Sequence, residues 1–425
     1  NEVILQNYSA SLVGLERYEE AAKLLEQFLS KSDQPRGHLQ KLVPIYRLLG
    51  FDIEQKLTEL DDEFFAGCGS RIKARVHADL RLFLQDIGGV EEGLRRMQEF
   101  EWIAGDAFEL AEAELAQNKL QSGLERYGVR FEAFPYLEWC QPAAPLYSGE
   151  ILDQEILFLW GEQGLGDEIM FSMFFERLAS RVKHVIVAMD FRLVGVFQQR
   201  YPHWQFLDRH NMPDDLPESD FSCPMGELMV LFLPEMLATD QHISQPIFNP
   251  DPKRHQQIAT ILKNKTKPRV AISWRGGANV NGLIRSMTLA ELMAGFPSNS
   301  DINLISLQYD DDAERDVIEY GDRRVELSGL DNKGDLEGVF ALLRCCDAVV
   351  TVDNAVAHFA VALGVPTAVL LPASQVQFRW KNTLMKNLLF PSAELFFQQK
   401  PSDWSVPVKA AWQMVESLTE TEKGR

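Results

Sequence analysis

Near the middle of the 425-residue chain, a carboxylate follows a glycine-rich turn. The turn holds Gly161, Gly164 and Gly166, it comes directly after the apolar run 155–160, and Asp167 ends it. Three glycines within six residues allow a ligand to approach the backbone closely. Asp167 is therefore either the N-cap of the next helix, where aspartate accepts backbone N–H groups, or a carboxylate that faces such a ligand.

A second polar cluster follows the apolar run 269–274. Arg275 precedes Gly276 and Gly277, and Arg285 stands near the end of the polar loop that follows. Arginines are by default solvated surface charges. Here two of them flank a glycine pair at the end of a strand, where bidentate contacts to a phosphate would stabilise a departing nucleotide.

A third cluster opens the helix expected at 353–364. Asp353 follows the buried run 347–352 and can cap this helix, and the backbone N–H groups of residues 354–356 suit a diphosphate. His358, one turn further along, either donates to a phosphate oxygen or is a partly buried histidine with its own partners.

The acidic run at 310–312 is the best candidate for a metal site, because clustered carboxylates bind hard cations. It also precedes the stretch AERDVIEY, and acidic residues in the first turn of a helix explain it more simply. The five cysteines show no metal-binding spacing and are interpreted as small core residues. We expect neither a metal ion nor a cofactor.

The composition limits the partners. A net charge of -20 and a pI near 4.9 argue against nucleic acid, which is bound through many lysine and arginine contacts to phosphate. No apolar run approaches the roughly 20 residues that span a bilayer. The first residues, NEVILQNYSA, lack the basic region of a signal peptide. We expect a cytoplasmic protein without a membrane span.

Amphipathic helices are expected to precede these clusters, over residues 1–135. Apolar residues recur there at three- and four-residue spacing, and the stretches 11–29 and 119–134 share Gly-Leu-Glu-Arg-Tyr at 14–18 and 123–127. A repeat at the scale of a helix pair predicts an α-solenoid, whose units bury their apolar faces only against neighbours. The first copy resembles a tetratricopeptide repeat.

Strands and helices alternate in the rest of the chain, which predicts two doubly wound α/β domains with a ligand cleft at the carboxyl ends of their strands. The expected segments are a connector at 136–150, a first Rossmann-like domain at 151–250, a hinge at 251–268, a second Rossmann-like domain at 269–400, and a C-terminal helix at 401–425 that packs back across the domains.

Three stretches together resemble the glycosyltransferase domain that many bacterial proteins carry beside tetratricopeptide repeats: WGEQGLGDE at 160–168, SWRGG with Arg285 and Ser286, and TVDNAVAHFAVALGVP at 351–366. That domain is similar to the ADP-heptose heptosyltransferases of GT-B architecture. The resemblance implies an inverting transfer from a nucleotide-sugar without a metal, with the acceptor on the first domain and the donor mainly on the second.

The resemblance also implies roles for single residues. Asp167 would be the general base that takes the proton of the acceptor hydroxyl. The implied acceptor-side loop consists of Gln163, Gly164 and Gly166. The implied donor-binding residues are Trp274, Arg275, Gly276, Gly277, Arg285, Ser286, Gln308, Asp353, Asn354, His358 and Arg379.

Three functions follow from these observations. The first is a glycosyltransferase whose helical region recruits a protein acceptor, as flagellin-modifying enzymes of this kind do. The second is a heptosyltransferase-like enzyme that acts on a glycolipid precursor; the chain shows no basic, apolar membrane-facing run that would favour it. The third is a non-catalytic interaction protein with inactive α/β domains, against which the presence of Asp167 and the arginines argues.

Overall fold

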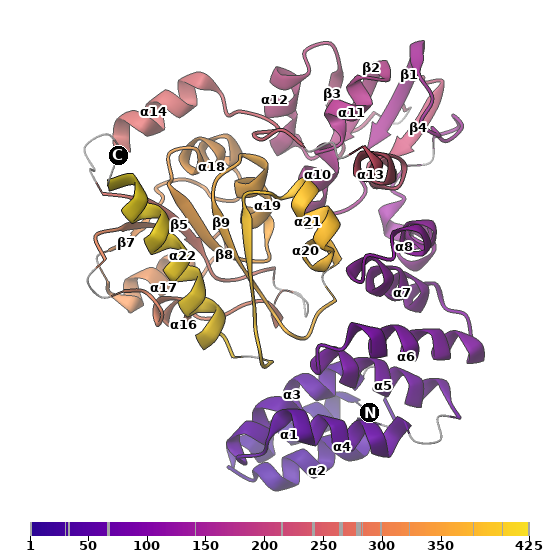
Figure 1. Ribbon diagram of the computed structural model, residues 1–425, viewed down its shortest axis with the longest axis vertical. Coiled ribbons are helices and arrows are strands. Elements are labelled where there is room, and N and C mark those ends of the chain that lie inside the picture. The colour runs from indigo at the N-terminus through magenta and orange to yellow at the C-terminus, as the bar shows by residue number, and fades with distance from the viewer. Residues whose placement is uncertain are drawn as a thin grey trace. The chain divides into compact units, whose positions relative to one another are not determined.

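The computed structural model describes residues 2–29, 31–32, 35–65, 69–140, 142–213, 216–239, 243–262, 267–277, 282, 284–297, 300–322, 324–376, 378–401 and 403–423. The chain forms two compact units (Figure 1). The helical unit comprises residues 1–135, 372–382 and 400–402. The α/β unit comprises residues 136–371, 383–399 and 403–425.

The helical unit is built from helix hairpins. Its amphipathic helices bury alanine, leucine and aromatic side chains against their neighbours, together with a few charged side chains such as Asp79, Glu114 and Arg130. They are α1 (Glu2–Gly14), α2 (Tyr18–Leu29), α3 (Pro35–Leu48), α4 (Ile53–Phe65), α5 (Arg71–Phe83), α6 (Ile87–Phe100), α7 (Ala104–Ala116) and α8 (Leu120–Tyr127), followed by α9 (Arg130–Ala133) and the short 3-10 helix η1 (Pro135–Leu137).

One turn recurs between the helices of a pair. Glu16, Gly50, Gln85 and Asn118 each have a left-handed backbone, with φ of 57°, 74°, 60° and 60°. In each turn the N–H of that residue bonds the carbonyl three residues back and the next N–H bonds the carbonyl five back, at 2.9–3.1 Å. The residue numbers 16, 50, 85 and 118 differ by 34, 35 and 33. The described part of the helical unit therefore contains four hairpins of nearly constant length.

This register corrects the repeat read from the sequence. Residues 14–18 form the end of α1, the turn and the first residue of α2, whereas residues 123–127 lie inside α8. In the repeat defined by the turns, Glu16 corresponds to Asn118. The shared pentapeptide is therefore displaced by seven residues from the structural repeat. The identity of the two pentapeptides does not mark equivalent positions.

A segment from far along the chain completes the last hairpin. In residues 372–382, helix α20 (Phe378–Lys381) packs on α7. The rings of Phe378 and Tyr127 lie 6.1 Å apart, and Nδ2 of the buried Asn382 donates to the Leu115 carbonyl at 2.7 Å. The sequence assigned all of 269–400 to the second Rossmann-like domain; this segment instead belongs to the helical unit.

The first sheet of the α/β unit is parallel, in the order β3-β2-β1-β4. Leu157 to Trp160 in its central strand are buried, as expected for a strand covered on both faces. Its strands are β1 (Leu152–Trp160), β2 (Val182–Met189), β3 (Gln205–Asp208) and β4 (Phe221–Pro224), and its helices are α10 (Leu165–Ser172), α11 (Phe175–Ala179), α12 (Phe191–Arg200) and α13 (Glu227–Ala238).

The second sheet is also parallel, in the order β10-β9-β8-β5-β6-β7. Helix α14 (Pro252–Leu262) lies between the two sheets in sequence. The strands are β5 (Arg269–Ser273), β6 (Asn303–Ser306), β7 (Val325–Leu327), β8 (Ala348–Val352), β9 (Thr367–Leu371) and β10 (Ala393–Phe397), and the helices are α16 (Leu289–Met293), α17 (Ala313–Tyr320), α18 (Leu336–Leu343), α19 (Ala355–Ala362), α21 (Thr383–Leu389) and α22 (Ser405–Lys423).

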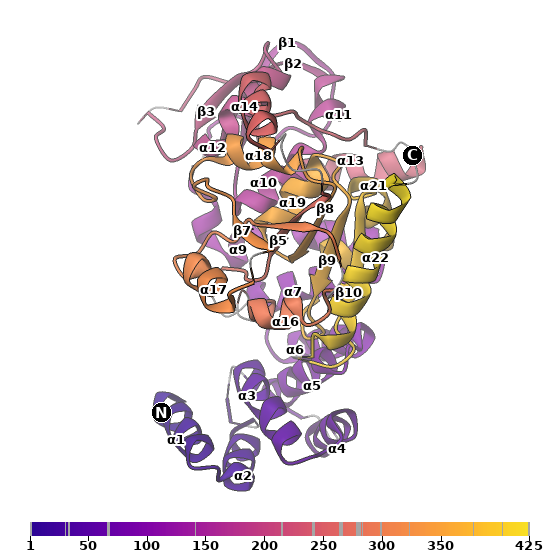
Figure 2. The ribbon, with the colours of Figure 1, turned by 90° about the vertical axis from the view of Figure 1, so that its left-hand side faces the viewer.

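The C-terminal helix α22 packs mainly on the second sheet. Its Val408, Ala411, Trp412 and Val415 are buried in the same apolar cluster as strands β5, β8 and β9, and Figure 2 shows the helix running beside β9 and β10. The expected packing across both α/β domains is therefore replaced by packing on one of them. Among the described residues, no helix is both long and apolar enough to span a bilayer.

Candidate active site

The strand orders place three loops where ligands bind in open α/β sheets. In the first sheet the chain proceeds from β1 to β2 and β3 and then returns to the other side of β1 with β4. In the second sheet β6 and β7 lie on one side of β5, and β8, β9 and β10 follow on its other side. Crevices form outside the carboxyl ends of the strands at such switch points. The glycine turn follows β1, and the Arg275 and Asn354 loops follow β5 and β8.

The glycine turn places Asp167 in the first turn of α10. The helix begins at Leu165 with Gly164 as its N-cap, so Asp167 is the third helical residue and not the N-cap, which was one of the two alternatives that the sequence left open. Its Oδ2 atom accepts the N–H of Gly164 at 3.2 Å, and the side chain is half-buried. A carboxylate here also interacts favourably with the positive end of the helix dipole.

Side chains from other segments donate hydrogen bonds to carbonyl groups of the glycine turn. Arg209, just after β3, donates Nη1 to the Gly161 carbonyl at 3.2 Å and Nη2 to the Gln163 carbonyl at 2.8 Å. The Nε1 atom of Trp139 also donates to the Gly161 carbonyl, at 2.5 Å. The backbone that leads to Asp167 is therefore fixed by two side chains from separate segments.

Glu168 is a buried acid that the sequence interpretation overlooked. Its Oε1 lies 3.0 Å from Nε of Arg209 as an ion pair, and its Oε2 accepts the N–H of Asp190 at 2.8 Å. Burial raises the pKa of Glu168 to about 7, an effect that the charges of Asp190 and Asp167 increase and that Arg209 and the Asp190 N–H oppose. The signal available in the sequence was its position at the head of the apolar run Ile169 to Phe171.

The loop after β5 is organised by Gln308. Its Oε1 accepts three donors at 2.9 Å: the Ser273 hydroxyl and the backbone N–H groups of Trp274 and Arg275. Its Nε2 donates to Oδ2 of Asp310 at 2.6 Å. Gln308 is buried, so it acts as an internal support of the loop.

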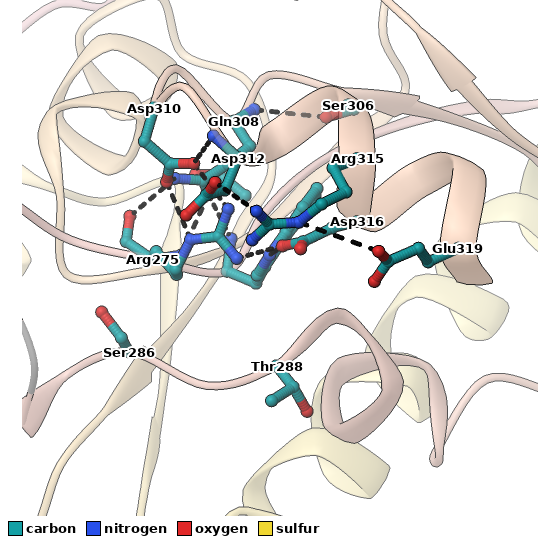
Figure 3. A network of polar contacts seen from close by, with 12 residues as sticks. Arg275, Ser286, Thr288, Ser306, Gln308, Asp310, Asp312, Arg315, Asp316 and Glu319 are labelled. Atoms are coloured by element: carbon teal, nitrogen blue, oxygen red, sulfur yellow. Dashed lines mark hydrogen bonds and ion pairs between the residues drawn. The ribbon is translucent and has the colours of Figure 1, made fainter.

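Arg275 is paired with carboxylates (Figure 3). Its Nε and Nη2 donate to the two oxygens of Asp310 at 2.8 and 2.5 Å, and Nη1 donates to Asp316. The hydrogen bonds to Asp310 and Asp316 raise the pKa of Arg275. Burial favours a raised pKa for Asp310, but Arg275 outweighs it and the pKa of Asp310 lies below its usual range.

The same pairing accounts for Asp310, the first residue of the acidic run at 310–312. Helix α17 begins at Ala313 with Asp312 as its N-cap, so Asp310 stands before the helix and not in its first turn. The described residues contain no group of three or more His, Cys, Asp or Glu side chains arranged to hold a metal ion.

Trp274 and Ser286 also support this loop. The Trp274 indole is fully buried and donates Nε1 to Asp316 at 3.1 Å, so it does not offer a surface to a ligand. The Ser286 hydroxyl accepts the N–H of Gly276 at 3.0 Å and donates to the Gly282 carbonyl at 2.7 Å. Gly277 is exposed at the edge of the described part of the loop.

Asn354 joins this loop to α19. It is the N-cap of the helix, the position the sequence interpretation gave to Asp353, and its Oδ1 accepts the N–H of Val356 at 2.9 Å. Its Nδ2 donates to the Ser273 hydroxyl at 2.8 Å and to the Arg275 carbonyl at 3.0 Å. Of the N–H groups expected to receive a diphosphate, that of Val356 is therefore already bonded.

Asp353 and Arg285 form an ion pair, with Oδ2 and Nη1 3.1 Å apart. Arg285 comes from the loop before α16 and Asp353 directly follows β8, so the pair joins two loops of the second sheet. The two arginines of this crevice, Arg275 and Arg285, face three carboxylates, those of Asp310, Asp316 and Asp353.

Helix α10, which follows the glycine turn of the first sheet, packs against α19 of the second sheet. A Cβ atom added at Gly166 would lie 2.9 Å from Cδ2 of the buried His358, so only glycine fits without a shift of the imidazole. Arg192, at the start of α12, also reaches the second domain and donates Nη1 to the Lys333 carbonyl at 3.0 Å. Arg379 lies on α20, within the helical unit, and its role in donor binding stays a prediction.

Residues 298–383 match the family model described as Glycosyltransferase family 9 (heptosyltransferase). The chain is similar to this family over that part of its length. The matched residues include Gln308, the Asp310 pair and the capped start of α19, while Asp167 precedes them.

Protein FlbA of Caulobacter vibrioides (strain ATCC 19089 / CIP 103742 / CB 15) is 25% identical over 321 residues, which are 68% of this chain and 53% of that protein. The chain thus spans about half the length of this curated relative. Two solved structures are each 14% identical and align with 64% of this chain. One is the glycosyl transferase family 9 from Veillonella parvula DSM 2008, of which 97% is aligned with a TM-score of 0.45. The other is the E. coli ADP-heptose lps heptosyltransferase II, of which 100% is aligned with a TM-score of 0.44.

Proposed function

We propose that the chain is an inverting, metal-independent glycosyltransferase of GT-B arrangement that uses a nucleotide-activated sugar. The observation that carries this proposal is the packing of α10 against α19. This packing brings Gly166, the neighbour of Asp167 at the switch point of one sheet, against His358 in the capped helix at the switch point of the other. An acid-base residue and an anion-binding helix end on opposite walls of a crevice suit attack from one side of a sugar and departure of a phosphate from the other.

In the proposed reaction, Asp167 accepts the proton of an acceptor hydroxyl as the oxygen forms a bond to the anomeric carbon. The bond from that carbon to the diphosphate breaks, and the negative charge moves to the departing nucleotide. The contact with the Gly164 N–H orients the carboxylate during this step. The role requires the ionised form of Asp167 within hydrogen-bond reach of the hydroxyl.

The donor diphosphate is proposed to bind at the N-terminus of α19, with His358 and Arg285 beside it. Because Arg275 and Arg285 face three carboxylates, the side chains of this crevice carry one net negative charge. The helix dipole and backbone N–H groups therefore supply much of the attraction. Arg285 is expected to move from Asp353 to a phosphate oxygen, while Gln308, Arg275 and Trp274 hold the loop in place.

The helical unit is proposed to bind a protein acceptor. The 33- to 35-residue spacing of its left-handed turns supports a tetratricopeptide type of solenoid, whose repeats are 34 residues long. Stacked hairpins of this kind present an extended concave surface, which suits a peptide segment better than a small molecule.

Nucleotide and transfer assays test the proposal. Purified protein is heated with a panel of nucleoside diphosphates and nucleotide-sugars, and a ligand that binds the native state raises the melting temperature. The stabilising nucleotide-sugar is then used for transfer by the natural chain and by Asp167→Asn. Asparagine keeps the volume and an acceptor for the Gly164 N–H but cannot take a proton. No stabilisation by any of the nucleotides, or undiminished transfer by Asp167→Asn, would contradict the proposal.

A further inference from the structure

We propose that Glu168 is a positioning residue, which acts through Arg209 to fix the glycine turn that presents Asp167. This inference rests on the proposed function for its catalytic consequence. The clamp itself stands on geometry: one guanidinium contacts the Gly161 carbonyl, the Gln163 carbonyl and the Glu168 carboxylate at 3.2, 2.8 and 3.0 Å.

The burial of Glu168 indicates that it has a particular role. A carboxylate in an apolar site costs free energy unless it is paired and hydrogen-bonded, and apolar residues of similar size would fill the same space at lower cost. Glu168 is fully buried, yet the three residues that follow it in α10 are all apolar. Its two oxygens face separate partners: Oε1 forms an ion pair with Nε of Arg209 that is not a hydrogen bond, and Oε2 accepts the backbone N–H of Asp190. Glu168 thus joins α10, the end of β2 and the segment after β3.

The glycine turn depends on this arrangement because it has few side chains of its own. Gly161 and Gly164 leave the backbone free to adopt other conformations, and external contacts must select one. A Cβ atom at Gly161 would lie 2.3 Å from Oε1 of Glu168, so the carboxylate occupies the space beside the turn. Without the negative charge of Glu168, the guanidinium of Arg209 keeps its two carbonyl contacts but loses the group that orients its Nε side.

Other charged groups also lie near Glu168. Asp190 and Arg192 form a second ion pair at the start of α12, and His210 lies 3.6 Å from Asp190. Asp167 stands next to Glu168 on α10 itself. The test therefore uses a direct reporter of the turn and not pH alone.

The reporter is Trp139, whose indole N–H bonds the Gly161 carbonyl. In protein labelled with ¹⁵N-tryptophan, the Trp139 indole resonance is assigned from its loss in Trp139→Phe. Glu168→Gln keeps the volume and the acceptor for the Asp190 N–H but removes the charge that faces Arg209. It should displace or broaden the Trp139 resonance above pH 8. The control is Glu235→Gln, a glutamate of the same domain that pairs with Arg177 and Arg181, and it should leave the resonance in place.

Transfer kinetics supply the second readout. A displacement of a catalytic group by about 1 Å can cost on the order of 100-fold in rate, so Glu168→Gln should lower kcat by roughly 10- to 100-fold. Nucleotide affinity should change less than twofold, because the donor crevice is untouched. Arg209→Gln should produce the same changes, and the double variant should be no worse than the worse single variant, because both residues belong to one clamp.

The outcomes separate this inference from the proposed function. An unchanged Trp139 resonance in folded Glu168→Gln overturns the clamp, whatever the enzyme transfers. If the Trp139 resonance is displaced in Glu168→Gln but kcat equals that of the unmodified protein, the positioning role is overturned. If the natural chain transfers no sugar, the proposed function fails while the Trp139 resonance still decides the clamp. Should Glu168→Gln not fold, Arg209→Lys tests the same contacts, because it keeps the charge and removes the fork that spans the two carbonyls.

Discussion

Replacement of Arg275 by alanine separates a supporting role from a ligand-binding role. In the structure its guanidinium makes three contacts to two carboxylates, whose side chains are 32% and 19% exposed. A hydrogen bond between charged groups contributes about 1.5–3 kcal/mol, and partial exposure reduces this value. Loss of the guanidinium also leaves Asp310 and Asp316 without their shared cation. We expect Arg275→Ala to lower the free energy of unfolding by about 3 kcal/mol.

Arg315 provides a matched control from the same network (Figure 3). It pairs with Asp312 and Glu319, but these side chains are 57–70% exposed. Exposed pairs of this kind contribute about 0–1 kcal/mol, so Arg315→Ala should be nearly silent. Asp316→Asn keeps an acceptor for the Trp274 indole and removes one negative charge. Added to Arg275→Ala, it should recover about 1 kcal/mol of the loss.

Urea unfolding, followed by tryptophan fluorescence, measures these differences, and calorimetric titration with nucleoside diphosphates measures donor affinity in parallel. The reasoning is refuted if Arg275→Ala is as silent in unfolding as Arg315→Ala. A tenfold loss of nucleotide affinity without a loss of stability would make Arg275 a ligand of the donor and not a support of the loop.

Four further outcomes are expected. Asp167→Asn should lower the transfer rate on the order of 100- to 10,000-fold with nucleotide affinity nearly unchanged, as checked by initial rates and calorimetry. Arg285→Ala should weaken nucleoside diphosphate binding by about 1.5–3 kcal/mol. The control is Arg344→Ala, a residue of the same domain that donates to the Leu363 carbonyl, and it should leave the affinity unchanged. Equal nucleotide affinities of the two variants would remove Arg285 from the site. Burial raises the pKa of Glu168 from 4.5 to about 7, so protonation of Glu168 stabilises the fold below pH 4.5 and this contribution disappears as the pH rises through 7. Across that range, the unfolding free energy of the unmodified protein should fall by about 3 kcal/mol relative to that of Glu168→Gln. Parallel pH profiles of the two proteins would contradict this expectation. A chain that begins at Tyr136 should be cleaved by protease within residues 372–382, because the partners of Phe378 and Asn382 are gone, whereas a chain that begins at Ser70 keeps α7 and α8 and should resist cleavage there.

The sequence predicts the central strands of both sheets but not all of their edges. Strands covered on both faces are continuous apolar runs, and 155–160, 269–274 and 347–352 all lie at the sheet centres. Three edge strands were not expected: β4, β7 and β10. They are three to five residues long, and β4 ends in a proline, so neither length nor alternation distinguishes them from loops.

The candidate site was predictable as a set of segments and less so as a set of contacts. A glycine turn after a buried strand and a polar residue at the start of a helix are local patterns. The caps were misplaced by a few residues, because aspartate near a helix start serves equally well as an N-cap or in the first turn. Arg275 and Asp310 are 35 residues apart, and Glu168 and Arg209 are 41 apart, so no local pattern assigns these pairs.

The helical unit shows why a shared peptide is weaker than a shared backbone conformation as a sign of repetition. Glu16, Gly50, Gln85 and Asn118 have different side chains, yet all four adopt a left-handed backbone and end a helix with the same pair of hydrogen bonds. Gly50 and, more weakly, Asn118 indicate that conformation in the sequence, whereas Glu16 and Gln85 enter it at a cost of about 1 kcal/mol or more that packing must offset. The apolar faces on either side of each turn supply that packing, so the period of the unit is set by burial and hydrogen bonding, and the sequence can change at every turn without altering it.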